Sequence, residues 1–201
     1  MYDEIKNKEE VEQTKKALEE RGINVVIKNT KEEALNYLKE TIPEKSSVMN
    51  GSSTTLGEIG FTDYLKNQSK WNNLHEDILN EEDQEKQNDL RRQSQAADYF
   101  LGSVNAISKE GELVAVDASG TRVGAYPFAA KNLILVSGTN KITENLDDAF
   151  KRTRQHAFPL EDKRALEAYG FNSTFGKWVI IEREIFPGRT TLVLVNEKLG
   201  Y

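Results

Sequence analysis

One short polar loop carries residue types that bind small anions. Gly51-Ser52-Ser53-Thr54-Thr55 places a glycine and four hydroxyl side chains between a predicted strand and a predicted helix. Free backbone N–H groups at such a junction, together with the hydroxyls, can hold a phosphate or a carboxylate. Gly51 would allow close approach of the backbone to a ligand. Ordinary turn and N-cap chemistry explains the same composition, and no Walker-type lysine follows, so a P-loop is excluded.

Further loops repeat this pattern at other predicted strand ends. The ligand-binding candidates that they contribute are Gly102, Ser103, Asn105, Gly120, Thr121, Arg122, Asn140 and Lys141. The guanidinium of Arg122 offers the fork that matches a carboxylate or phosphate, and Lys141 could neutralise an anion. Asn105 has both donor and acceptor capacity. The alternatives are local backbone bonding for Asn105, a surface ion pair for Arg122 and a solvated Lys141.

The candidates for acid–base catalysis are Glu58 and Asp117, each of which could instead cap a helix. His75 and His156 lie far apart in the sequence, and there is no cysteine. We therefore predict no zinc site, no Ser-His-Asp arrangement, no iron–sulfur ligation and no bound cofactor.

Composition limits the class of partner. The formal net charge is −6, which makes a nucleic-acid partner improbable because phosphate backbones are bound by clustered Lys and Arg. No apolar stretch approaches the ~20 residues of a membrane span. The segment Met1-Tyr2-Asp3-Glu4-Ile5-Lys6 lacks the features of a secretory signal, so we expect a cytoplasmic protein.

Hydrophobic patterning indicates which elements position these loops. Helices are expected over residues 3–21, 30–41, 55–65, 81–97, 121–130 and 144–156, and strands over 23–28, 47–50, 99–107, 111–116, 133–136, 177–184 and 190–195. The Pro187-Gly188 turn between the last two strands predicts a C-terminal β-hairpin. The alternation of helices and strands predicts one α/β domain over 1–201, with three layers, a mostly parallel sheet, and residues 1–45 as an extension packed on it.

Several segments together resemble the lactate-utilisation (LUD) domain family. The stretch Ala97–Val114 is similar to its central signature, and Val116–Val123 to its Gly-(Asn or Thr)-Arg-Val element. Gly51–Gly60 resembles its Ser/Thr-rich loop, Val136–Ile142 its Gly-x-Asn-Lys-Ile segment, and Leu199-Gly200-Tyr201 its usual ending. The resemblance covers most of the chain from about residue 47 onward.

The resemblance implies a fold like that of ribose-5-phosphate isomerase, glucosamine-6-phosphate deaminase and the CoA transferases. It also implies an accessory role in oxidation of L-lactate to pyruvate, with iron–sulfur partner subunits and a small-anion pocket. Alternatives are an isomerase-like or transferase-like enzyme acting on a sugar phosphate or CoA ester, and a non-catalytic regulatory or scaffold module. Relatives of this fold are often oligomeric, so a homo-oligomer is possible.

The sequence departs from relatives in two ways. Many of them carry a cysteine-rich segment where residues 164–177 here have none. The acidic catalytic motif of the phosphosugar isomerases and the nucleophilic glutamate motif of the CoA transferases are also absent. The sequence therefore indicates a pocket more firmly than it indicates a reaction.

Overall fold

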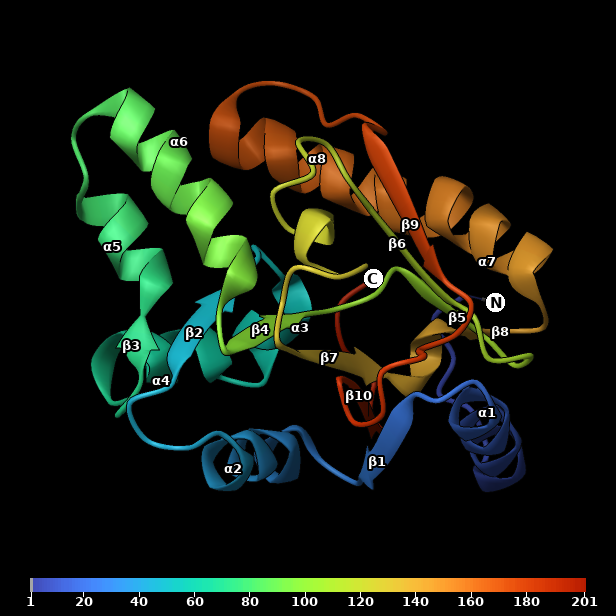
Figure 1. The fold of residues 1–201 in the computed structure, drawn as a ribbon. Helices are drawn as coiled ribbons and strands as arrows, with labels where there is room; N and C mark the ends of the chain where they lie inside the picture. Colours follow the sequence, from blue (N-terminus) through green and yellow to red (C-terminus); the bar gives the residue numbers. More distant parts are fainter. Residues whose placement is uncertain (1) are drawn as a thin grey trace.

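The computed structural model describes residues 2–201, which fold into helices packed around two sheets (Figure 1). The helices are α1 (Lys8–Glu20), α2 (Lys31–Thr41), α3 (Thr54–Glu58), α4 (Phe61–Asn67), α5 (Leu74–Asn80), α6 (Gln84–Gln93), α7 (Leu146–Arg152) and α8 (Phe158–Tyr169). Short 3-10 turns are η1 (Ser94–Ala96), η2 (Val123–Ala125) and η3 (Thr139–Lys141), and η4 (Thr153–Ala157) is a π-helical turn that joins α7 to α8.

The main sheet has six strands, and all of its neighbouring strands are parallel. Its order is β1 (Asn24–Lys28), β10 (Thr190–Val195), β7 (Asn132–Gly138), β4 (Tyr99–Gly102), β2 (Ser47–Asn50) and β3 (Asn72–Asn73). The fold is therefore α/β with a mostly parallel sheet, as the sequence predicts. Segment 1–45 supplies β1, an edge strand of this sheet.

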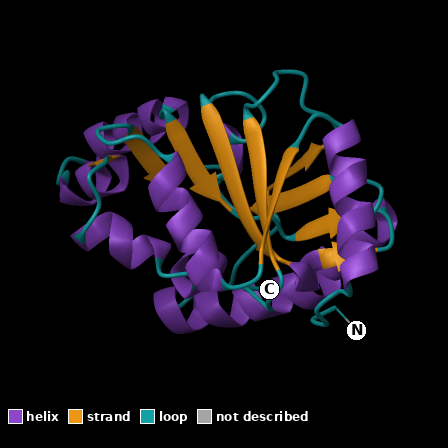
Figure 2. Ribbon diagram, turned by 90° about the horizontal axis from the view of Figure 1, so that it is seen from below, coloured by secondary structure: helices purple, strands orange, loops and turns teal. Residues whose placement is uncertain are grey.

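Alternating side chains of the central strands divide the core between the two faces of the main sheet. Leu133 and Leu135 of β7 face a cluster that includes α1 and α5, whereas Ile134 and Val136 face a cluster built from α2, α3 and α4. This alternation is the period-2 pattern of a strand that is buried on both sides. Figure 2 shows the helices around the edges of the fanned strands.

A second sheet covers part of the first face. Its order is β8 (Ile142–Thr143), β5 (Ala106–Ser108), β6 (Leu113–Asp117) and β9 (Lys177–Ile181), with β6 antiparallel to both β5 and β9. Its outer face packs on α7 through Ala149, Phe150 and Trp178. No helix among residues 2–201 is long and apolar enough to cross a membrane.

The predicted C-terminal hairpin is wrong. β9 pairs with β6 in the second sheet, whereas β10 inserts between β1 and β7 in the main sheet. The predicted strand over 99–107 is likewise divided between β4 and β5, which lie in different sheets. The helix expected over 121–130 is only the 3-10 turn η2. In each case sheet pairing or packing over long sequence distances overrides the local pattern.

Candidate functional site

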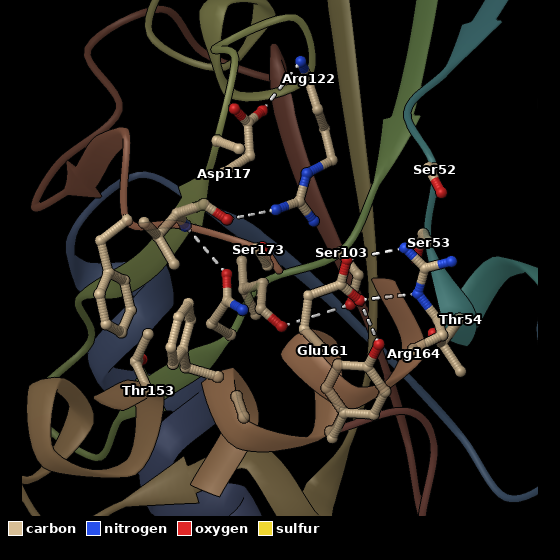
Figure 3. Close-up of a pocket in the computed structure, with 18 of the residues that line it drawn as sticks. Ser52, Ser53, Thr54, Ser103, Asp117, Arg122, Thr153, Glu161, Arg164 and Ser173 are labelled. Atoms are coloured by element: carbon tan, nitrogen blue, oxygen red, sulfur yellow. Dashed lines mark hydrogen bonds and ion pairs between the residues drawn. The ribbon is translucent and has the colours of Figure 1, made fainter. Parts of the chain in front are cut away.

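A pocket of about 270 Å³ lies between the carboxyl ends of the main-sheet strands and the helix α8 (Figure 3). Its floor comes from the loops after β2 and β4, represented by Ser52–Thr55 and Ser103–Asn105, and from Lys141 after β7. Parallel sheets bind ligands at this edge because the loops that follow neighbouring strands converge there. The three regions predicted from the sequence therefore meet at one cavity.

The first loop contributes hydroxyls rather than a long helix dipole. The Ser53 hydroxyl accepts a hydrogen bond from Leu56 N at 3.3 Å and so caps α3. The cap of α3 is thus Ser53, and Glu58, which the sequence offers as a possible cap, is the last residue of this helix. Because α3 has only five residues, its N-terminus concentrates little positive charge. All four hydroxyl residues of this loop line the pocket, and Figure 3 shows Ser52, Ser53 and Thr54 along one of its edges.

Lys141 lies at the base of the pocket and is only 2% exposed. Its Nζ donates to Thr55 Oγ1 at 3.0 Å, to Ser103 Oγ at 3.2 Å and to the Val104 carbonyl at 3.1 Å. Burial, with added repulsion from the charges of Arg152 and Arg122, holds the pKa of Lys141 well below its usual value. The side chain is therefore neither solvated nor paired with an acidic residue within the described part of the chain.

Arg122 is positioned by Asp117 and by the second sheet. Asp117 accepts hydrogen bonds from the backbone N–H groups of Gly120, Arg122 and Val123, which fixes the turn after β6. The Arg122 guanidinium donates to the Val116 carbonyl at 2.6 Å. It forms no ion pair with any residue that the structure describes, and it lines the pocket. Its remaining N–H groups can thus bind an anion.

The wall opposite Arg122 comes from α8. Arg164 donates to both carboxylate oxygens of Glu161, at 2.8 and 2.7 Å, and the Tyr201 hydroxyl also donates to Glu161. Burial acts to raise the pKa of Glu161, but the bonds from Arg164 and Tyr201 outweigh it, and the pKa is lowered. The hydrogen bonds with Glu161 raise the pKa of Arg164. This pair is ionised, and its charges largely cancel.

An aromatic ladder closes the same side of the pocket. Phe158 and Phe175 stack with ring centroids 4.0 Å apart, and Phe175 stacks on Trp178 at 5.4 Å. Phe158 and Phe175 both line the cavity. Thr153 and Ala157 of the π-helical turn also line it, at a kind of helix irregularity that is common at functional sites. This side of the pocket thus combines aromatic surface with the Glu161–Arg164 ion pair.

The structure brings most of the predicted site residues together. Those that line the pocket are Ser52, Ser53, Thr54, Thr55, Ser103, Asn105, Asp117, Thr121, Arg122 and Lys141. Asn105 is also bonded to β6 of the second sheet, because its Oδ1 accepts from Val116 N at 2.9 Å.

Two predicted polar residues lie outside the pocket and hold segment 199–201 instead. Glu58 accepts a hydrogen bond from Gly200 N at 2.6 Å. Asn140 Oδ1 accepts from Leu199 N at 3.2 Å, and its Nδ2 donates to the Gly200 carbonyl at 3.4 Å. These bonds place Tyr201 in the wall beside Glu161.

Three of the predicted glycines, Gly51, Gly102 and Gly120, do not line the pocket but allow the backbone around it to pack closely or to turn. A Cβ on Gly51 would lie 2.3 Å from Arg122 Cγ, and one on Gly102 would lie 2.0 Å from the Tyr126 hydroxyl. Gly120 has φ = +91°, which favours glycine in the turn that Asp117 fixes. The close approach expected at Gly51 and Gly102 is therefore to side chains of the protein.

Sequence reasoning missed the wall built by α8 and Tyr201. Glu161 and Arg164 belong to a charged run, Glu161-Asp162-Lys163-Arg164, that resembles a solvated helix face. Their i, i+3 spacing predicts a mutual ion pair but no pocket. The segment Leu199-Gly200-Tyr201 resembles the usual ending of the family, and this resemblance predicts no place in the pocket. No local pattern indicated that these residues face the first loop.

No group of three or more His, Cys, Asp or Glu that could hold a metal ion occurs among residues 2–201. The site is thus an α/β pocket at the carboxyl edge of a parallel sheet, with hydroxyls, an unpaired arginine and a buried lysine. The LUD domain family matches residues 11–195, and the chain belongs to this family.

A solved structure supports the same fold. The chain is similar to the crystal structure of a DUF162 family protein from Deinococcus radiodurans, with a TM-score of 0.53 and 12% sequence identity. The similarity covers 93% of this chain and 96% of that one. At this identity the likeness concerns the fold alone. No curated protein shows significant sequence similarity to the chain.

Proposed function

We propose that this LUD-domain protein binds a small organic anion, a carboxylate or phosphate, in the pocket beneath Arg122. The observation that carries the proposal is the unpaired guanidinium of Arg122 on the same cavity as the buried amine of Lys141. The acidic groups of the lining are already engaged, Asp117 by backbone N–H groups and Glu161 by Arg164. An anionic ligand would therefore meet donors rather than repulsion.

We propose further that the pocket serves L-lactate utilisation, with the protein as an accessory component of lactate oxidation to pyruvate. The name of the family supports this role. Electrons would pass to iron–sulfur partner subunits, because the chain contains no cysteine to ligate a cluster.

The pocket does not favour the acid–base enzyme that the sequence left open. Glu58 lies outside the cavity and bonds Gly200 N. Both carboxylate oxygens of Asp117 accept backbone hydrogen bonds, which leaves it poorly placed to take a proton from a substrate. The proposed role is binding rather than isomerisation.

Isothermal titration calorimetry with lactate, pyruvate, inorganic phosphate, sugar phosphates and CoA esters tests the proposal. The test variant is Arg122→Gln, and the matched control is Arg92→Gln, which removes an exposed arginine of α6 that pairs with Asp89. Loss of a charged hydrogen bond is worth about 1.5–3 kcal/mol, so we expect affinity to fall roughly tenfold or more in Arg122→Gln only. Binding by none of these anions, or equal affinity in both variants, would refute the proposal.

A further inference from the structure

Lys141 occupies an unusual environment for a lysine. All three partners of its Nζ are uncharged, namely two hydroxyls and one backbone carbonyl. Hydroxyl groups either donate or accept, so Thr55 or Ser103 can donate to the lone pair of a neutral amine while that amine donates to the Val104 carbonyl. The same partners therefore satisfy the neutral form of Lys141, with no need for a buried ammonium.

The charges around Lys141 also favour its neutral form. Burial is the main cause of its low pKa, and the positive charges of Arg152 and Arg122 lower that pKa further. Glu58 and Asp3 act in the opposite direction but do not compensate. Arg152 itself is fully buried, and it bonds the carbonyls of Tyr2 and Asn105 rather than a carboxylate. An unprotonated amine is a nucleophile, whereas an ammonium is not.

Within residues 2–201, the pocket is lined by one lysine, Lys141, by its hydroxyl partners Thr55 and Ser103, and by Arg122. Arg122 and Lys141 line the same cavity, so a ligand whose carboxylate bonds Arg122 shares that cavity with Nζ. We propose that Lys141 forms a Schiff base with the carbonyl of a 2-oxo carboxylate, of which pyruvate is the simplest example. This inference rests on the anion pocket of the proposed function and names its substrate class.

The step balances without any further reactant. The lone pair of Nζ attacks the carbonyl carbon, the C–N bond forms, and the carbonyl oxygen takes a proton to give a carbinolamine. The C–O bond then breaks, and the oxygen leaves as water that carries both protons of the original amine. The product is a C=N bond between Nζ and the former carbonyl carbon, with no net oxidation or reduction. The hydroxyls of Thr55 and Ser103, both within 3.2 Å of Nζ, are placed to pass protons during these steps.

Reductive trapping tests the inference. The protein is incubated with pyruvate at neutral pH, treated with sodium borohydride, and examined by intact mass and peptide mapping. Lactate, which has a hydroxyl in place of the 2-oxo group, serves as the ligand control, and pyruvate binding is measured separately by calorimetry. The variants are Lys141→Met, which removes the amine at similar length, and Lys177→Met, which removes an exposed lysine beside the Gly120 turn.

We expect one reduced adduct per chain, mapped to Lys141, in the wild type and in Lys177→Met, with none in Lys141→Met and none with lactate. Calorimetric binding of pyruvate without an adduct at Lys141 would overturn the Schiff base and leave the anion pocket intact. Failure of every anion to bind would overturn the pocket itself. Adducts spread over surface lysines to the same extent in Lys141→Met would also overturn the inference. Because mapping of the wild type locates the adduct, the test holds even if Lys141→Met does not fold.

Discussion

Replacement of Gly51 by alanine tests how the fold holds the anion-binding arginine. The added Cβ would lie 2.3 Å from Cγ, 2.6 Å from Cδ and 2.8 Å from Cβ of Arg122. These atoms belong to the base of the side chain, so Arg122 must change its rotamer or its backbone position. Gly51 does not have a positive φ, so the alanine itself causes no backbone strain.

The expected magnitude follows from the bond that is lost. The Arg122 guanidinium donates to the Val116 carbonyl at 2.6 Å, and a hydrogen bond from a charged group contributes about 1.5–3 kcal/mol. Alanine also reduces the conformational entropy of the unfolded chain, and this offsets about 0.4–1 kcal/mol of the lost stability. We therefore expect Gly51→Ala to reduce the free energy of unfolding by about 1–2 kcal/mol and to weaken anion binding.

Urea denaturation with calorimetry measures both effects, and Gly57→Ala is the matched control. A Cβ on Gly57, within α3, would meet no atom within 4 Å, so alanine should stabilise the protein by up to about 1 kcal/mol. In an Arg122→Ala background most of the cost of Gly51→Ala should vanish. If Gly51→Ala is as stable as Gly57→Ala, or keeps wild-type anion affinity, the contact between Gly51 and Arg122 does not position the arginine.

Two further predictions concern groups that support the two sheets. Burial acts to raise the pKa of Glu184, but hydrogen bonds from Phe186 N, the Thr190 hydroxyl and Arg189 lower this pKa overall. The ionised carboxylate therefore stabilises the fold above its unfolded pKa of about 4.3. This stabilisation is lost as the pH falls through the pKa of the folded state. Glu184→Gln should thus lower the free energy of unfolding by about 2–3 kcal/mol near neutral pH. Thermal denaturation from pH ~7 to ~3 should show the stability difference between variant and wild type shrinking below pH ~4. A stability difference that stays constant over this range would contradict this account. Tyr126→Phe removes a fully buried hydroxyl that donates to the Ser103 carbonyl at 2.9 Å, and we expect urea denaturation to show a loss of about 1–2 kcal/mol. Unchanged stability in Tyr126→Phe would mean that this bond does not hold the Ser103 loop.

The sequence determined the pocket's location more securely than its contents. Polar loops that follow β-branched strands can be recognised locally, and in a parallel sheet the carboxyl ends of those strands must share one edge. The loops at Ser52–Thr55 and Ser103–Asn105 therefore meet as expected, with Lys141 beside them. Arg122 instead follows β6, which is antiparallel to its neighbours in the second sheet, so the packing of the two sheets brings it to this pocket. The parallel α/β fold followed from the alternation of helices and strands.

Only the tertiary structure decided what each of these residues does. Burial of Lys141 among hydroxyls depends on loops that are more than thirty residues apart in sequence. β10 likewise pairs with β1 and β7, which are distant in the sequence, and does not form a hairpin with β9. Glu161, Arg164 and Tyr201 form a wall because segment 199–201 is held by Glu58 and Asn140. Such properties arise from desolvation and from contacts across the whole chain, which a local pattern of residues does not encode.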